Sequence, residues 1–293
     1  MVKIDRKITV AIKLAVSALL LVMLFRAAQW SAVIEALQGL DRAWLAWALL
    51  LFVPQTLLSA WRWRELIAGE THLTLGDSLR QTLASNAFNL IMPAKTGDFT
   101  KAAWAGVTSP AGRVRLGRCV LIEKLADVAC LLLCIVAGQV AQPLAIIGPT
   151  VVVVLLIVGM WERSRSQPTH YLRPLVATVG LWILHLAQIQ CFLLAAGVPS
   201  SLNSTLVRVP LALFSGLMPG TFCGFGSRDS ALVWLYADVA PAATMAVVGL
   251  LTALRYLVPG AAGIVVLLVS PVGLASGEGK SSEIGATMKL AKS

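Results

Sequence analysis

The chain has 293 residues, of which 58% are hydrophobic and 13% charged, with a mean hydropathy of +0.81. A soluble domain of this size needs far more polar surface, so the composition excludes that class and indicates that the lipid bilayer is the solvent. The formal net charge of +10 does not indicate a nucleic-acid partner. The basic residues cluster in short segments beside long apolar runs, as topology signals do.

Long apolar runs predict the membrane-spanning helices. A helix needs about 20 apolar residues to cross the hydrocarbon core, and six runs approach that length, at 8–25, 44–60, 119–138, 144–160, 175–196 and 242–270. The run at 8–25 imitates a secretory signal, but it is long for one, and we interpret it as a retained first helix. Residues 1–270 are therefore predicted to form a single transmembrane domain. Residues 271–293 are small and polar and predict a disordered cytoplasmic tail.

Two further apolar stretches, 79–104 and 205–236, are interrupted and do not fit simple spans. Each has a short apolar helix, a Met-Pro pair at Pro93 or Pro219, a glycine-bearing polar break and a second short helix. Proline and glycine end a helix, and the freed backbone groups must face protein or water rather than lipid. We therefore predict an all-α polytopic membrane protein with six full transmembrane helices and two re-entrant helical hairpins.

The distribution of basic residues orients this layout. With the N-terminus in the cytoplasm, sixteen Lys and Arg residues fall on the cytoplasmic side, Arg62 and Lys101 among them, and three on the opposite side. A bias of this size places both termini in the cytoplasm. The order span, span, hairpin, span then occurs twice, in repeat one at 8–138 and repeat two at 144–270. Because each repeat has three full spans, the second is inverted, an arrangement that points to a transporter binding site.

Ionisable residues within the spans and hairpins are the candidate functional residues, since each costs about 2.5–3.5 kcal/mol to insert. The second helix of each hairpin is predicted to begin near Asp98, capped by Thr96 or Asp98, and near Arg228, capped by Ser227. Both N-termini would point at one region where glycine N–H groups and basic side chains form an anion site, with phosphate as the natural occupant. The predicted substrate-binding residues are Lys95, Gly97, Asp98, Gly224, Gly226, Arg228, Asp229 and Arg255.

A simpler interpretation of the same charges is structural. Asp98 and Asp229 would then neutralise Lys95 and Arg228 or Arg255, since intramembrane ion pairs are common.

Glu123 and Asp127 lie one helical turn apart on the third span and share a face. Near the cytoplasmic end of that span they would snorkel or pair with Arg115 or Arg118. In the functional alternative, the deeper Asp127 pairs with a basic hairpin residue or carries a coupling proton.

No motif predicts catalysis. No nucleophile–base array, phosphate loop or HExxH helix occurs, and the five cysteines form no CxxC pair. We therefore expect no enzymatic activity, no cofactor and no metal.

Five segments occur in the order seen in one known family: LSAWRWRELI (58–67), NLIMPAKTGDFTKA (89–102), VLIEKLADVACLLL (120–133), GLMPGTFCGFGSRDSAL (216–232) and ALRYLVPGAAGIVVLL (253–268). They resemble the flippase-like transmembrane domain of lysylphosphatidylglycerol synthases and its stand-alone bacterial and archaeal relatives, over roughly residues 8–270. By position, the resemblance implies site roles for Pro93, Gly97, Asp98, Glu123, Asp127, Gly224, Gly226, Arg228, Asp229 and Arg255. Lys124 and Asp229 depart from the family's usual arginine and glutamate but keep the charge. Residues 221–223 depart from its glycine-leucine stretch.

Relatives in that family are implicated in moving or presenting polar lipids across the membrane, including aminoacylated phosphatidylglycerol. The resemblance therefore implies a membrane lipid translocase, either a flippase or a scramblase, for a phosphate-containing anionic lipid or a glycolipid. The alternatives are a secondary transporter of a small organic anion, coupled through Asp98, Asp127 or Asp229, and a non-transporting accessory subunit of an envelope-lipid pathway. The expected location is the cytoplasmic (inner) membrane of a bacterium or archaeon. The expected partners are the lipid, a separately encoded lipid-synthesis enzyme and a second copy in a homo-oligomer, with no nucleic acid.

Overall fold

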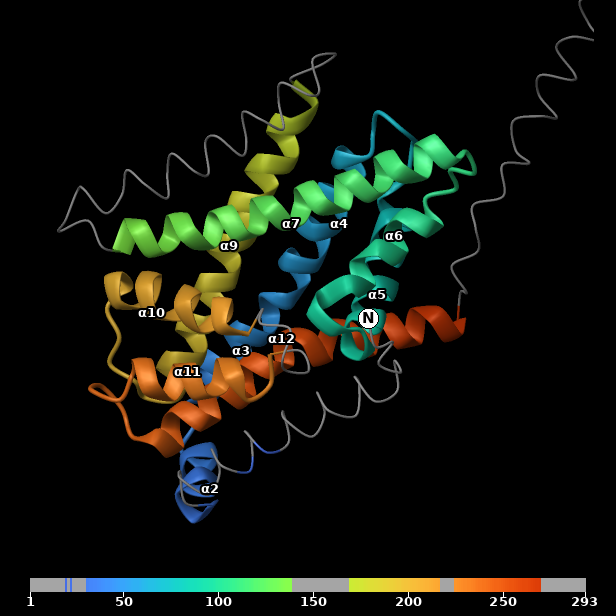
Figure 1. Cartoon of the computed structure of the whole chain (residues 1–293). Coiled ribbons are helices and arrows are strands. Elements are labelled where there is room, and N and C mark those ends of the chain that lie inside the picture. The colour runs from blue at the N-terminus through green and yellow to red at the C-terminus, as the bar shows by residue number, and fades with distance from the viewer. Residues whose placement is uncertain (1–18, 20–21, 23–29, 139–168, 217–223, 270–293) are drawn as a thin grey trace, which may run out of the picture.

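The computed structural model describes residues 30–138, 169–216 and 224–269 together with the isolated residues 19 and 22, and for 93–95 and 169–171 it describes the backbone alone. Every regular element in these ranges is helical, which confirms the all-α class (Figure 1). The predicted spans at 8–25 and 144–160, the break at Pro219 and the tail at 271–293 lie outside the described residues.

The helices follow one another along the chain in two series. The first comprises α2 (Trp30–Gln38), α3 (Arg42–Leu50), α4 (Phe52–Leu66), α5 (Leu75–Ile91), the 3-10 helix η1 (Pro93–Asp98), α6 (Phe99–Trp104) and α7 (Pro110–Gly138). The second comprises α9 (Thr169–Ala195), α10 (Leu202–Ser215), α11 (Ser227–Leu235) and α12 (Ala242–Val269).

Among the described residues, three helical stretches are long and apolar enough to cross a membrane, namely Arg42–Leu66, Leu172–Ala195 and Ala242–Val269. They correspond to the spans predicted at 44–60, 175–196 and 242–270, and they indicate a multi-pass membrane protein. The predicted span at 119–138 lies within α7, which has 29 residues and is helical throughout, but its first half carries many charges. A total of six full spans therefore stays a prediction.

The first predicted hairpin is a helix, a break and a second helix. The hydroxyl of Thr74 accepts a backbone hydrogen bond and so caps the start of α5. The helix ends at Met92 (φ −84°, ψ 135°), because a residue before proline is pushed into extended backbone. After η1, the chain folds back on α5, and Gln81 Nε2 donates a hydrogen bond to the carbonyl of Trp104 at 3.0 Å.

The second predicted hairpin also folds back, since α10 packs against α11. Its return begins at Gly224 and Gly226, whose φ angles of 75° and 87° favour glycine. A Cβ at Gly224 would lie 2.8 Å from the carbonyl oxygen of Gly216, so the two backbones are in close contact there. Both predicted breaks therefore have the expected helices on their two sides, while their re-entry into a membrane stays a prediction.

The contacts between the two series of helices are preserved when the helices of one predicted repeat are exchanged for those of the other. The main contacts pair α4 with α9, α5 with α12 and α7 with α10. The predicted repeat makes α4 equivalent to α9, α5 to α10 and α7 to α12. Under that exchange the α4–α9 contact is unchanged and the α5–α12 contact becomes the α10–α7 contact. The packing thus has the two-fold relation expected of two repeats, whereas their opposite orientation in the membrane stays a prediction.

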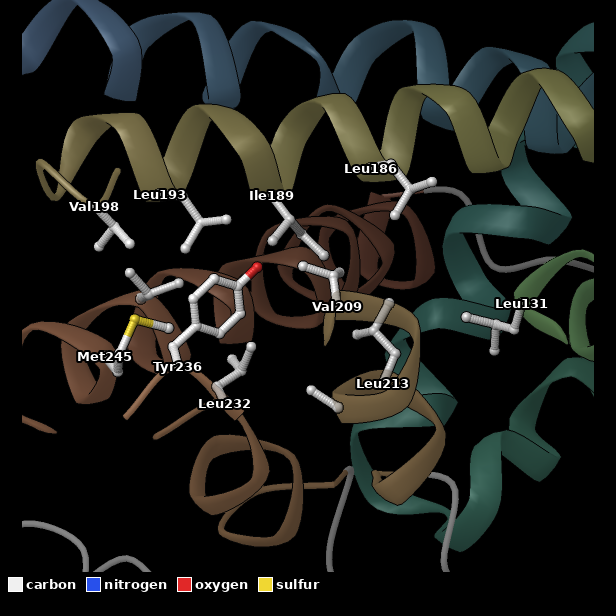
Figure 2. Close-up of a cluster of buried hydrophobic side chains, with 12 residues drawn as sticks. Leu131, Leu186, Ile189, Leu193, Val198, Val209, Leu213, Leu232, Tyr236 and Met245 are labelled. Atoms are coloured by element: carbon white, nitrogen blue, oxygen red, sulfur yellow. The ribbon is translucent and has the colours of Figure 1, made fainter. Parts of the chain in front are cut away.

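A buried hydrophobic cluster joins the second series to α7 (Figure 2). In Figure 2 the ring of Tyr236 lies between side chains of α9 and those of the segments that follow α10. The cluster includes Leu131, Leu186, Ile189, Leu193, Val198, Val209, Leu213, Leu232, Tyr236 and Met245. It fixes α10 and α11 against α9, so the second hairpin is a firmly packed element of the fold.

The α5–α12 contact depends on a small residue at position 263. A Cβ at Gly263 would overlap the carbonyl oxygen of Leu83 on α5. We expect Gly263→Ala to destabilise the protein by about 1–3 kcal/mol through overpacking, visible as a lower apparent melting temperature in detergent. The matched control is Gly117→Ala in α7, where a Cβ has no neighbour within 4 Å. An equal effect of the two substitutions would contradict the close α5–α12 approach.

Candidate functional site

A cavity of about 340 Å³ lies between helices of both series. Its volume is in the range of small-molecule sites. Within the described part of the chain, seven charged side chains line it: Arg62 on α4, Asp98 on η1, Lys101 on α6, Glu123, Lys124 and Asp127 on α7, and Arg255 on α12. Charges are costly among membrane-embedded helices, so this cavity is the candidate functional site.

Arg62 pairs with two carboxylates in the cavity wall. Its Nη2 lies 2.8 Å from Glu123 Oε1, and its Nη1 lies 2.7 Å from Asp127 Oδ1. The Nη1 group also donates to the hydroxyl of Thr178 on α9 at 3.2 Å. Arg62 is 4% exposed and Glu123 3%. The planar guanidinium thus satisfies two neighbouring acids at once, a geometry that a lysine cannot reproduce.

Lys101 continues the ion-pair network from α6. Its Nζ donates to both carboxylate oxygens of Glu123, at 3.1 and 3.2 Å, and lies 3.6 Å from Asp98 Oδ1. Lys101 is 1% exposed, and its ammonium lies 5.2 Å from the centroid of the Trp63 ring. Glu123 is therefore shared between α4 and α6, which ties both helices to α7.

Asp98 is held by charged and neutral partners together. It forms an ion pair with Lys124 of α7, and it accepts hydrogen bonds from Asn89 Nδ2 at 2.9 Å and Ser85 Oγ at 3.3 Å. Asp98 is the residue at the N-cap position of α6, as predicted, but its side chain makes no cap hydrogen bond. The carboxylate of Asp98 is engaged by its basic partners instead.

Arg255 is the cation that the network does not neutralise. It lines the cavity from α12, and its Nε and Nη1 atoms are buried without a hydrogen-bond partner among the described residues. No carboxylate within the described ranges forms an ion pair with it. Among the described residues of the lining, four basic and three acidic side chains thus leave one positive charge in excess, located at Arg255.

The second hairpin neutralises its own charges. Arg228 donates to Asp229 Oδ1 from Nη2 at 2.5 Å and from Nε at 2.9 Å, and to the carbonyl of Gly249 on α12 at 3.2 Å. Arg228 is 1% exposed. Asp229 also accepts the backbone N–H of Gly226 at 3.1 Å. The prediction that Ser227 caps α11 is therefore wrong: Gly226 is the cap position, and Asp229 binds its N–H group.

The predicted site residues fall into two groups. Asp98, Glu123, Asp127 and Arg255 meet in the lining of one cavity. The remaining ones that the structure describes lie in buried contacts outside that lining, namely Gly97, Gly224, Gly226, Arg228 and Asp229. The simpler, structural interpretation applies to Arg228 and Asp229, which pair with each other. The side chain of Lys95 lies outside the described residues.

Two residues of the network were expected on the cytoplasmic surface. The positive-inside count assigned Arg62 and Lys101 to that side, which stays a prediction, and the structure adds that both are buried in ion pairs. The alternative in which Glu123 and Asp127 pair with Arg115 or Arg118 is wrong, because both acids bind Arg62 and Arg115 binds Glu70 at 2.7 Å. The basic-aromatic segment at 58–67 contains Arg62 and is one of the motifs that resemble the family. Neither hydropathy nor spacing in the sequence indicates that this segment contacts α7.

The lysylphosphatidylglycerol synthase transmembrane region is a known protein family, and its family model matches residues 10–161. The match covers more than half of the 293 residues, so the chain belongs to this family of lipid-related membrane proteins, as the motifs predicted. The matched region contains Arg62 and all the network residues on η1, α6 and α7, while Arg255 lies beyond it. No curated protein shows a significant match to the chain.

The ion-pair network predicts that replacing a buried arginine destabilises the protein far more than replacing an exposed one. Replacing Arg62 by Gln leaves Glu123 and Asp127 short of their shared partner, so we expect a loss of about 3–5 kcal/mol in stability. The control Arg115→Gln removes an exposed pair with Glu70 and should cost about 0–1 kcal/mol. Apparent melting temperatures in detergent compare the two. Adding Asp127→Asn to Arg62→Gln should recover part of the loss, and equal losses in both single variants would contradict the network.

Proposed function

We propose that the chain is a membrane lipid translocase, a flippase or scramblase, that moves a polar, phosphate-containing anionic lipid between leaflets. The observation that carries the proposal is the charged cavity between the two series of helices, with Arg255 unneutralised in its lining. Membership of the lysylphosphatidylglycerol synthase transmembrane family supports a lipid as substrate.

The cavity suits the physical problem that translocation poses. A headgroup crossing the bilayer loses its water, and a charged group in hydrocarbon costs several kcal/mol unless it finds partners. Paired side chains in the cavity wall offer fixed dipoles and charges in place of water, and Arg255 offers a full positive charge to the phosphate. The acyl chains need no such site, because lipid tails are soluble in the surrounding bilayer.

The proposed cellular location and orientation rest on the topology predicted from the sequence. The chain resides in the cytoplasmic (inner) membrane of a bacterium or archaeon with both termini in the cytoplasm, and it carries out no chemistry of its own. A separately encoded enzyme makes the lipid, and the chain works alone or as a homo-oligomer.

One observation favours a second candidate, a proton-coupled transporter of a small organic anion. Asp127 faces the cavity with a side chain that is 24% exposed, more than that of Glu123 or Asp98. A partly exposed carboxylate beside a substrate is suited to exchange a proton with water. This candidate requires a soluble substrate and a rate that depends on the pH gradient.

The translocase proposal predicts a specific loss at Arg255. In liposomes containing tail-labelled phosphatidylglycerol, Arg255→Gln should lower the protein-dependent rate of leaflet exchange by about tenfold or more, the worth of a charge-assisted hydrogen bond. The control Arg208→Gln removes the same charge from a bidentate pair with the exposed Asp238 and should leave the rate within about twofold. Equal rates for wild type and Arg255→Gln would contradict the site.

A further inference from the structure

The cavity contains more unsatisfied donors than Arg255 alone. Arg62 Nε and Thr82 Oγ1 are buried without a hydrogen-bond partner among the described residues, and both residues line the cavity. Arg62 is 4% exposed and Thr82 2%. Buried polar groups normally have partners, so donors from α4, α5 and α12 that lack them around one cavity point to a bound acceptor.

The charge of that acceptor follows from the charges of the lining. Asp98, Glu123 and Asp127 are each neutralised by a basic side chain of the network, and one positive charge remains at Arg255. A bound ligand with one negative charge would neutralise this excess positive charge. An occupant with two would leave a negative charge uncompensated beside three carboxylates, and like charges at such distances cost several kcal/mol.

We propose that the cavity selects a phosphodiester monoanion and discriminates against a phosphomonoester dianion, with Arg255 and Thr82 as donors to the bound phosphodiester. The inference rests on the proposed function for the lipid as source of the phosphodiester. The three carboxylates then set the selectivity, because they limit how much negative charge the cavity accepts. Removing one of them raises the excess positive charge from one to two.

The test compares two lipids with identical tails. Dioctanoyl phosphatidylglycerol and dioctanoyl phosphatidic acid are titrated into the full-length protein in detergent at pH 7.5, and apparent dissociation constants are read from the thermal shift. A phosphomonoester carries about −1.5 to −2 charges near neutral pH. The wild type should bind the diester about tenfold more tightly, which corresponds to about 1.4 kcal/mol.

The predicted selectivity should change when either the charge of the cavity lining or the charge of the ligand changes. Asp127→Asn should abolish or reverse the preference, whereas Thr82→Val should weaken diester binding by about two- to tenfold, as expected for one hydrogen bond. The charge-matched control Asp238→Asn removes an exposed carboxylate that does not line the cavity and should leave the preference unchanged. At pH 5 the wild-type preference should vanish, because phosphatidic acid then carries one charge, and this arm needs no variant to fold.

Binding of a water-soluble phosphodiester distinguishes a failure of this inference from a failure of the proposed function. Water-soluble glycerophosphoglycerol has the same phosphodiester without tails, and it should bind far more weakly than the dioctanoyl lipid. If it binds as tightly, the preference for a monoanion over a dianion stands. The lipid translocase is then overturned in favour of a transporter of a soluble anion. If phosphatidic acid binds the wild type as tightly as phosphatidylglycerol at pH 7.5, or Asp127→Asn leaves the preference unchanged, the inference is overturned while lipid translocation stands on its own assay.

Discussion

The double ion pair of Arg62 constrains most of what surrounds the cavity. Its guanidinium reaches Glu123 and Asp127 only if α4 and α7 are held in one register, since the two acids lie a helical turn apart. A carboxylate left unpaired in this environment costs several kcal/mol. Glu123 then presents both oxygens to Lys101, which fixes α6, and Lys101 in turn lies beside Asp98 at the break of the first hairpin. The hairpin is thereby positioned by electrostatics as well as by its packing on α5.

In the proposed function, the attraction of the cavity for a phosphate comes from the positive charge that the ion-pair network does not neutralise. Most basic residues near the cavity are occupied by acids, so a count of lysines and arginines overstates its attraction for a phosphate. Arg255 differs because α12 carries it to the cavity wall without an acid opposite it among the described residues. Among the described residues, the charged groups of the cavity come from the first predicted hairpin, from α4 and α7, and from one buried arginine on α12. The convergence of two positively charged hairpin ends stays a prediction, because the side chain of Lys95 and residues 217–223 lie outside the described residues.

The parts of this arrangement that are local in sequence could be predicted, and the long-range parts could not. Apolar runs and the Met92–Pro93 pair predict α5, its end and the helices around it, because helix length and the proline constraint act within a few residues. Arg62 and Glu123 are 61 positions apart, and no periodicity connects them. A hydropathy profile interprets a basic residue at the end of a span as part of the flanking loop. It therefore does not distinguish an arginine that is buried in the packed protein from one that lies in the cytoplasm. For the same reason the nearby Arg115 looked like the natural partner of Glu123, whereas it binds Glu70.

The two repeats share their packing but not their charges. Exchange of the halves relates the α5–α12 contact to the α10–α7 contact, yet the acid of the first hairpin is shared with lysines of α6 and α7, while Asp229 is consumed by its neighbour Arg228 and by a backbone N–H group. This asymmetry suits the proposed translocation. A carrier must bind its cargo strongly enough to admit it and weakly enough to release it. On the proposed function, free basic groups on both hairpins would add further uncompensated charge and slow release, whereas a single excess charge at Arg255 would attract a phosphodiester without trapping it. The pairing of Arg228 with Asp229 would then matter for the strength of the site as much as the excess charge at Arg255 does.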